Sequence, residues 1–240
     1  MKTIIVIPTY NESENISRLF DSIFASLPEA EVLVVDDNSP DGTREIIESR
    51  MKTNEKIHLI NRPGKMGLGT AYCEGFQWAL KNGFEVIFEM DADFSHDPRV
   101  LPKFLETLKD HDFVIGSRYK TGWNVVNWPL RRLILSYGAN LYTRIITGMP
   151  IYDATGGYKC FRASALAKID FSTIHSNGYG FQIEMNYRLW KNKERYIEMP
   201  IIFVDRQNGV SKMNKRIIFE AVYLVWKLRF TRFKNKKRTP

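Results

Sequence analysis

The first two thirds of the chain alternate short apolar runs with longer stretches whose apolar residues recur at helical spacing. The apolar runs predict strands at residues 3–7, 32–35, 57–60, 86–90 and 113–115. The stretches between them predict helices at residues 14–27, 43–51, 69–82 and 99–110. Thr43 and Asp97 are candidate helix caps, and Pro98 takes a first helical position. Strands and helices in alternation predict an α/β fold, a mostly parallel sheet with helices on both faces.

The pattern changes beyond residue 123. It predicts a helix at residues 129–147, a turn-rich loop at 153–159, a helix at 180–190 and a short strand at 201–204. An amphipathic or wholly apolar helix is expected at residues 214–230. The chain therefore divides into one domain over residues 1–213 and a C-terminal amphipathic helix with its tail over residues 214–240.

Polar clusters directly follow four of the predicted strands. They occupy residues 8–12, 36–43, 91–97 and 116–119. Ligands of open α/β sheets bind outside the carboxyl ends of the strands. We therefore expect these four loops to meet at one edge of the sheet and to form a site there.

Asp91 and Asp93 follow the apolar strand at residues 86–90. In an extended segment, residues i and i+2 point to the same side, so both carboxylates would face one space. Two anions that close repel each other unless a cation lies between them, and hard oxygen ligands suit Mg²⁺ or Mn²⁺. The alternative is that these acids only solubilise a turn or cap the helix after Pro98.

The acids that follow the second strand have a similar ambiguity, because Asp and Asn also make good turns and caps. We expect Asp37 to bind ligand and residues 41–43 to form the start of a helix. The histidines show no zinc-ligand spacing and are expected at the surface or in turns. They are His58, His96, His111 and His175.

Charge is distributed unevenly along the chain. The formal net charge is +8, yet residues 212–240 hold ten Lys or Arg against one acid, Glu220, which leaves 25 basic and 26 acidic residues before them. The near-neutral body argues against nucleic acid as the main ligand. Cys73 and Cys160 lie far apart in a long chain, which predicts two buried free thiols and a reducing, cytoplasmic location.

The C-terminal helix raises the question of a membrane. Aromatic residues and flanking cations in residues 215–232 fit a helix that lies among lipid headgroups, peripheral on the cytosolic face. The expected partners are therefore a membrane surface or small membrane-anchoring subunits. The alternative is that this helix packs on the domain or on a partner subunit and leaves a solvated basic tail. No stretch reaches the roughly 18 apolar residues that a membrane-spanning helix needs.

Several motifs in order resemble a known family. Residues 8–12 (PTYNE), 34–43 (VVDDNSPDGT) and 91–93 (DAD) are similar to the inverting family 2 glycosyltransferases of GT-A fold. Further motifs lie at residues 67–72, 116–119, 153–158 and 206–212. Together they resemble the dolichol-phosphate, or polyprenol-phosphate, mannosyltransferases of that family. The resemblance runs over residues 3–213, which is most of the chain.

The resemblance implies a nucleotide-sugar donor, a divalent metal, Mg²⁺ or Mn²⁺, and a polyprenyl-phosphate acceptor in a membrane. It implies metal ligands at Asp91 and Asp93, with Ser95 at a position where some relatives carry Gln. The implied donor-binding residues are Pro8, Tyr10, Glu12, Val35, Asp37, Ala92, Arg206 and Lys212. The implied acceptor-phosphate residues are Arg118, Arg132 and Ser136. Asp91, Asp93 and Arg118 are the implied catalytic residues.

The resulting hypothesis is an enzyme that transfers mannose from GDP-mannose to a polyprenyl phosphate with inversion. One alternative is a related transferase that uses UDP-glucose or another sugar nucleotide on the same kind of lipid. A second alternative is a binder of lipid or nucleic acid with no catalytic activity, in which the acids only shape loops. The sequence leaves open the acceptor length, the preferred metal and the oligomeric state.

Overall fold

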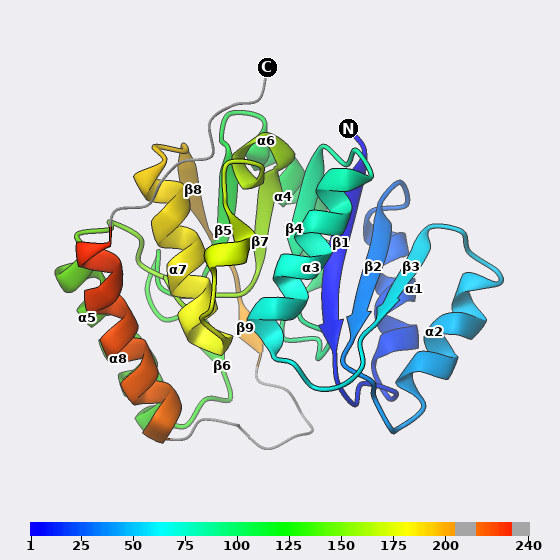
Figure 1. Ribbon diagram of the computed structural model, residues 1–240, viewed down its shortest axis with the longest axis horizontal. Coiled ribbons are helices and arrows are strands. Elements are labelled where there is room, and N and C mark those ends of the chain that lie inside the picture. The colour runs from blue at the N-terminus through cyan, green and yellow to red at the C-terminus, as the bar shows by residue number, and fades with distance from the viewer. Residues whose placement is uncertain (205–214, 232–240) are drawn as a thin grey trace.

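The computed structural model describes residues 1–204 and 215–231 (Figure 1). Its strands are β1 (Thr3–Thr9), β2 (Glu31–Asp36), β3 (Ile57–Asn61), β4 (Val86–Glu89), β5 (Phe113–Ser117), β6 (Val125–Val126), β7 (Lys159–Arg162), β8 (Tyr196–Pro200) and β9 (Phe203–Val204). Its α-helices are α1 (Ile16–Ser26), α2 (Thr43–Met51), α3 (Leu68–Lys81), α4 (Leu101–Leu108), α5 (Leu130–Thr147), α6 (Ala163–Leu166), α7 (Gly178–Lys191) and α8 (Lys215–Phe230). Two 3₁₀ turns are η1 (Pro98–Val100) and η2 (Phe171–Thr173).

Seven strands form one sheet in the order β3-β2-β1-β4-β7-β5-β8. All are parallel to one another except β7, which pairs antiparallel with β4 and β5. Strands β6 and β9 form a separate parallel pair. The carboxyl ends of β1, β2, β4 and β5 therefore lie at the same edge. This confirms the predicted α/β class and brings the four polar loops to one edge of the sheet.

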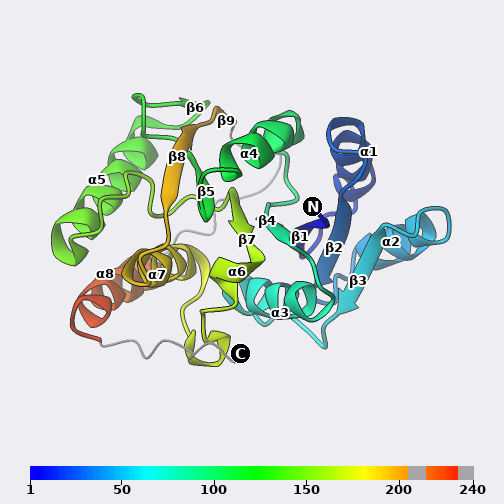
Figure 2. The same cartoon turned by 90° about the horizontal axis from the view of Figure 1, so that it is seen from above.

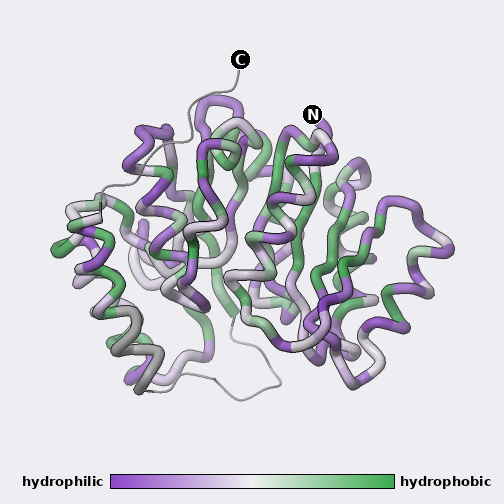
Figure 3. The backbone as a smooth tube through the Cα atoms, in the orientation of Figure 1, coloured by the Kyte–Doolittle hydropathy of each residue, from purple (hydrophilic) through white to green (hydrophobic). Residues whose placement is uncertain are grey.

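Helices cover both faces of the sheet (Figure 2). One apolar core lies under α3, α6 and α7, and includes Phe76, Phe161 and Phe181. The other lies under α1, α2 and α4, and includes Phe20 and Phe104. The strands between them are the most hydrophobic part of the backbone trace (Figure 3). Burial of apolar side chains on both faces explains why these strands read as continuous apolar runs in the sequence.

Three strands differ from the sequence prediction. Strand β7 begins at Lys159, inside the predicted turn-rich loop, and its four residues carry a charge at each end. The sequence predicted a strand at residues 201–204, but the main strand of this region, β8, ends at Pro200. Within the predicted range only the two residues of β9 are extended. Strand β4 ends at Glu89, so Asp91 and Asp93 are not on an extended segment. They lie instead in a bend, in which Phe94 has a left-handed φ of 59°. This bend, rather than the alternation of side chains along a strand, orients the two carboxylates.

Most predicted helices are confirmed to within two residues, and Asp97 caps η1 by accepting from the Arg99 amide, with Pro98 as its first residue. Thr43 is the first residue of α2 rather than its cap. Cys73 and Cys160 are free and buried, as predicted. Helix α8 packs against α5 and α7 at one end of the molecule (Figures 1 and 2). In residues 1–204 and 215–231, no helix combines the length and the apolar composition needed to cross a membrane.

Candidate active site

The loops after β1 and β2 are joined to each other by backbone and side-chain hydrogen bonds. The amide of Asp37 donates to the Thr9 carbonyl at 3.0 Å, which continues the ladder between the two strands. The amide of Glu12 donates to the Thr43 hydroxyl at 2.9 Å. Two of the expected donor-binding residues, Tyr10 and Glu12, are therefore held on a rigid loop, and both side chains are partly accessible.

Asp37 forms a buried ion pair with Arg62, a residue that the sequence did not single out. Arg62 Nη1 lies 2.9 Å from Asp37 Oδ1, and both side chains are almost fully buried. The other carboxylate oxygen, Oδ2, accepts hydrogen bonds from the amides of Met66 and Gly67 at 3.1 and 3.3 Å. Asp37 thus shapes the loop after β3, which brings the side chain of Lys65 over the Tyr10 ring at 4.0 Å.

Asp41 has the structural role that the sequence predicted for residues 41–43. Its Oδ1 accepts hydrogen bonds from the Thr43 amide and hydroxyl, at the start of α2. Burial alone would raise the pKa of Asp41, but hydrogen bonds from Thr43 and Ser13 outweigh burial and lower the pKa to about 2. Gly42 lies at a φ of +88°, a conformation that glycine adopts without strain.

Three of the expected donor-binding residues contribute little side-chain surface. Val35 is fully buried in the core, and Ala92 is nearly so. Pro8 is partly buried and pairs in register with Val35 across β1 and β2. The side chains of Val35 and Ala92 are therefore closed to direct contact with a ligand in this structure. Arg206 and Lys212 lie outside the described residues.

The turn that carries Asp91 and Asp93 is held by two aromatic side chains. The Tyr72 hydroxyl donates to Asp91 Oδ1 at 3.0 Å, and the Asp91 amide donates to Nδ1 of His96 at 3.0 Å. Burial and the charges of Asp91, Glu89 and Asp93 raise the pKa of Tyr72 well above its usual value. Asp91 and Asp93 thus share one electrostatic environment close to Tyr72.

His96 lies in this turn, one of its two expected positions, but it is buried rather than at the surface. Its ring stacks on Tyr158 with centroids 4.7 Å apart, and burial lowers its pKa to about 4. The ring is therefore neutral near pH 7 and accepts at Nδ1 the hydrogen bond that orients the backbone of Asp91. Only the three-dimensional packing of β7 against this turn places His96 here.

The donor set at this turn fits a hard divalent cation. Asp91 and Asp93 supply carboxylate oxygens, and Ser95 lies two residues further on. Ser95 is buried, and its hydroxyl oxygen has no hydrogen-bond partner among the described residues. An unsatisfied buried hydroxyl is costly, and a nearby cation or cation-bound water would satisfy it. The described residues hold no cluster of three or more His, Cys, Asp or Glu side chains suited to a metal.

A fully buried polar cluster lies directly beneath this turn. Glu89 on β4 faces Lys159 on β7, with Lys159 Nζ 3.4 Å from Glu89 Oε2. Gln182 on α7 accepts from Lys159 and donates to Glu89, which closes the cluster. Burial raises the pKa of Glu89 to about 7 and lowers the pKa of Lys159. The cluster joins two strands and a helix two residues away from Asp91.

Arg118 lies at the end of β5, as predicted, and is held by Asp153. Its Nε and Nη2 donate to the two carboxylate oxygens of Asp153 at 2.8 and 2.6 Å, and Nη2 also donates to the Thr155 hydroxyl. The amides of Tyr152 and Asp153 donate to Glu198 on β8, which positions the loop that carries Asp153. No described residue accepts a hydrogen bond from Nη1 of Arg118.

The three expected acceptor-phosphate residues line one pocket. Arg118, Arg132 and Ser136 border a cavity of about 400 Å³ that lies between α5, α7 and α8. Its remaining walls are mostly apolar and include Leu135, Tyr142, Ile183, Val222 and Val225. The Arg132 guanidinium lies 4.1 Å from the centre of the Trp128 ring, and the Tyr119 hydroxyl donates to Ser136 Oγ at 2.7 Å. Cationic groups thus lie beside a long apolar wall.

Phe203 on β9 links this pocket to the Asp91 turn. Its ring centroid lies 5.8 Å from that of His96 and 5.5 Å from the guanidinium carbon of Arg118. A single aromatic side chain therefore separates the two parts of the site. The tertiary structure thus brings together residues from the turn after β4, the end of β5 and β9.

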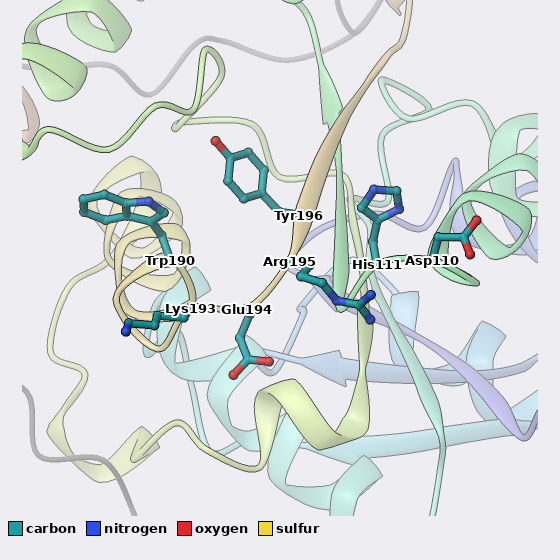
Figure 4. A pocket seen from close by; sticks show the side chains of 7 residues that line it. All are labelled: Asp110, His111, Trp190, Lys193, Glu194, Arg195 and Tyr196. Carbon is teal, nitrogen blue, oxygen red and sulfur yellow. The ribbon is translucent and has the colours of Figure 1, made fainter.

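A second hollow lies at the opposite edge of the sheet (Figure 4). It has a volume of about 550 Å³ and is lined by Asp110, His111, Trp190, Lys193, Glu194, Arg195 and Tyr196. These residues precede or begin β5 and β8, whereas ligands of such sheets bind at the carboxyl ends of the strands. Arg195 pairs with Asp112, and Glu194 with Lys168. This hollow contains none of the predicted site residues.

Comparison with known proteins identifies the family of this chain. Residues 4–170 match the model of glycosyl transferase family 2. The chain is 45% identical over 222 residues to an undecaprenyl-phosphate mannosyltransferase of Micrococcus luteus. That match covers 92% of this chain and 91% of the relative. It is 44% identical over 232 residues to a polyprenol monophosphomannose synthase of Mycolicibacterium smegmatis. That match covers 95% of this chain and 88% of the relative. The chain belongs to glycosyl transferase family 2, which confirms the resemblance and the prediction of a glycosyltransferase.

Solved structures support the fold. Glucosyl-3-phosphoglycerate synthase of Mycobacterium tuberculosis, in complex with Mn²⁺, uridine diphosphate and phosphoglyceric acid, has a TM-score of 0.71. The match covers 97% of this chain and 80% of that chain at 13% identity. A complex of the same synthase with Mn²⁺, uridine diphosphate and glucosyl-3-phosphoglycerate has a TM-score of 0.69. The predicted GT-A-type architecture is thereby confirmed.

Proposed function

We propose that this glycosyltransferase transfers mannose from GDP-mannose to a polyprenyl phosphate, with inversion at the sugar. The observation that carries the proposal is the pocket in which Arg118, Arg132 and Ser136 border a mostly apolar cavity. A polyprenyl phosphate has an anionic head and an apolar chain, and this pocket offers both kinds of surface. The names of the two relatives at 44% and 45% identity support the same acceptor class and sugar.

The chemistry follows from the charge of the acceptor. A phosphate monoester has a second pKa of about 6, so near pH 7 its oxygen is already largely anionic and needs no strong general base. This oxygen forms a bond to the anomeric carbon while the bond from that carbon to the donor diphosphate breaks. The nucleoside diphosphate leaves with the electron pair. Positioning of the two anionic reactants is therefore the main task of the protein.

Arg118 is suited to position the acceptor phosphate. Asp153 holds two of its nitrogens, so the guanidinium has a fixed direction toward the pocket. Guanidinium groups bind phosphate oxygens through charged hydrogen bonds. Arg132 lies near the start of α5, where the helix dipole also favours an anion. Ser136 completes the set with a hydroxyl that is oriented by Tyr119.

The donor would bind against the loops after β1, β2 and β4. Tyr10, Glu12 and Asp37 lie on two of these loops, and Asp91 and Asp93 on the third. Asp91 and Asp93, with Ser95 as a third oxygen donor or a donor to bound water, would hold Mg²⁺ or Mn²⁺. A bound cation of this type stabilises the charge that develops on a departing diphosphate. Arg206 and Lys212, outside the described residues, are proposed to contact the same diphosphate.

A panel of labelled donors tests this function. Purified protein, a polyprenyl phosphate and Mg²⁺ are incubated with GDP-mannose, UDP-glucose and other sugar nucleotides, and lipid-extractable label is counted. We expect label from GDP-mannose above every other donor. Preferential label from UDP-glucose would instead establish the related glucosyl transferase. Absence of lipid-linked label with all donors would refute transfer to this acceptor class.

A further inference from the structure

Helix α5 exposes a continuous apolar stripe, of which only Ile134 also lines the proposed acceptor pocket. Leu130, Ile134, Tyr137, Leu141 and Ile145 recur at intervals of three and four residues, which places them on one side of the helix. Leu130, Ile134 and Ile145 expose 66%, 62% and 69% of their surface. The opposite side of α5 is buried through Asn140, Thr143 and Thr147. Exposed apolar surface of this extent is unusual for a protein surface that faces only water.

Helix α8 carries a second stripe next to the first. Tyr223, Trp226 and Phe230 are exposed, while Val225 and Leu228 pack into the core. The two helices run side by side, since Arg229 donates to the Thr147 carbonyl at the ends of both. Trp123, 62% exposed, packs edge to face on Tyr137 and extends the apolar surface beyond the start of α5.

The charged residues of helices α5 and α8 are almost all positive. Helix α5 contains three arginines and no acid, and α8 contains four cations and one acid. Arg131, Lys227 and Arg229 are exposed beside the apolar stripes. A protein partner that covered an apolar stripe would not require this bias, whereas a surface of anionic lipid headgroups attracts it. Aromatic side chains that have both apolar and polar parts are also favoured at such a boundary.

The stripes continue into the proposed acceptor pocket. Ile134 belongs to the α5 stripe and also lines the cavity, and Val222 and Val225 of α8 line its opposite wall. We propose that the exposed stripes of α5 and α8 form a docking surface for an anionic lipid bilayer. The surface holds the pocket against the bilayer, so that an acceptor phosphate reaches Arg118 while its apolar chain stays in lipid. This last step rests on the proposed function, whereas bilayer docking does not.

The test uses vesicle flotation without any substrate. The full chain is mixed with vesicles of phosphatidylcholine alone, or with about one third phosphatidylglycerol. We expect binding to the anionic vesicles that weakens as salt rises. The double variant Leu141→Glu/Ile145→Glu places charge in the α5 stripe at residues that do not line the pocket, and it should reduce binding at least about tenfold. Tyr223→Glu/Phe230→Glu makes the same test on α8.

A matched control distinguishes this surface from apolar residues elsewhere. Met51→Glu changes an exposed apolar residue at the end of α2, at the other end of the molecule (Figure 1). It should bind vesicles as the unaltered chain does. Circular dichroism and thermal melting should show all variants folded, since every altered side chain is exposed.

The outcomes separate docking from catalysis. Vesicle binding by the α5 and α8 variants equal to that of the unaltered chain would overturn the docking surface, whatever the transfer assay shows. Vesicle binding that depends on both stripes supports docking even if no donor yields lipid-linked label. Transfer to a water-soluble short-chain phosphate should be unchanged in the stripe variants. If sedimentation shows a dimer that these variants dissociate, and vesicles are not bound, the stripes contact a second copy and the proposal is wrong.

Discussion

The guanidinium of Arg118 is held by the carboxylate of Asp153 through two hydrogen bonds, and both side chains are buried. The pair joins the end of β5 to the loop before β7 and leaves one nitrogen of Arg118 without a described partner. Opposite charge on Asp153 keeps the cation stable in the protein interior. Burial by itself would lower the pKa of Arg118. The attraction of the Asp153 carboxylate outweighs burial and raises this pKa above its usual value. The group is therefore always charged and always oriented.

The first prediction concerns this orientation. Arg118→Lys keeps the charge but cannot form the two-pronged contact with Asp153. Loss of a charged hydrogen bond of about 1.5–3 kcal/mol corresponds to roughly 10- to 100-fold in transfer rate at low acceptor concentration. Donor binding, measured by calorimetry, should change little. Lys103→Arg, on exposed α4, is the control. Unchanged transfer by Arg118→Lys would contradict the positioning role.

The second prediction concerns the metal. Asp93→Ala should abolish transfer and leave the thermal melting temperature close to that of the unaltered protein, because Asp93 is partly exposed in the turn. EDTA should abolish transfer by the unaltered protein, and added Mg²⁺ or Mn²⁺ should restore it. Asp110→Ala, which removes an acid at the opposite edge of the sheet, should retain full activity. Turnover by the Asp93→Ala variant would rule out the assigned role.

The third prediction concerns the buried cluster beneath the site. Lys159→Met removes the only cation that contacts Glu89 among the described residues. Breaking a buried pair by removal of one partner costs about 3–5 kcal/mol of stability. The variant's free energy of unfolding in urea should fall by that amount, and Glu89→Gln in the same chain should recover part of it. Lys168→Met disrupts a partly exposed pair with Glu194 and should cost only about 0–1 kcal/mol. Equal losses of unfolding free energy in Lys159→Met and Lys168→Met would contradict the larger contribution assigned to the buried pair.

The fourth prediction concerns pH. The pKa of Asp41 is lowered to about 2 from 3.8, so its carboxylate stabilises the folded state at pH values above 3.8 and loses that effect as pH falls toward 2. Asp41→Asn keeps the shape but removes the charge. The stability difference between the two proteins should be constant above about pH 5 and shrink between about pH 4 and 2. Denaturant unfolding at several pH values measures it, and a difference independent of pH would refute the assignment.

The sequence and the structure agree where local chemistry dominates. The apolar runs at β1, β2 and β4 predicted the central strands because burial on both faces leaves continuous apolar segments. Residues 41–43 were predicted as a helix start, and hydrogen bonds from Thr43 to Asp41 confirm it. The family motifs identified the glycosyltransferase class, which the match over residues 4–170 confirms.

Residues that act through distant partners escaped prediction. Arg62 resembles any surface cation in the sequence, and only the packing of β3 beside β2 places it on Asp37. His96 lies in a turn, as its sequence context allows, but its burial depends on Tyr158, which directly precedes β7 and stacks on its ring. Strand β7 itself carries the buried charge of Lys159, which obscured its place in the centre of the sheet.

The sequence alone determined the α/β class, the edge of the sheet at which the polar loops gather, and the residue types available there. These follow from hydrophobic periodicity and from short motifs, which act between neighbours in the chain. Tertiary structure alone decided that Arg118 is held by Asp153, that Glu89 is paired with Lys159, and that α5 and α8 present apolar stripes side by side. Such relationships depend on packing between segments far apart in the chain, and no local pattern of residues records them.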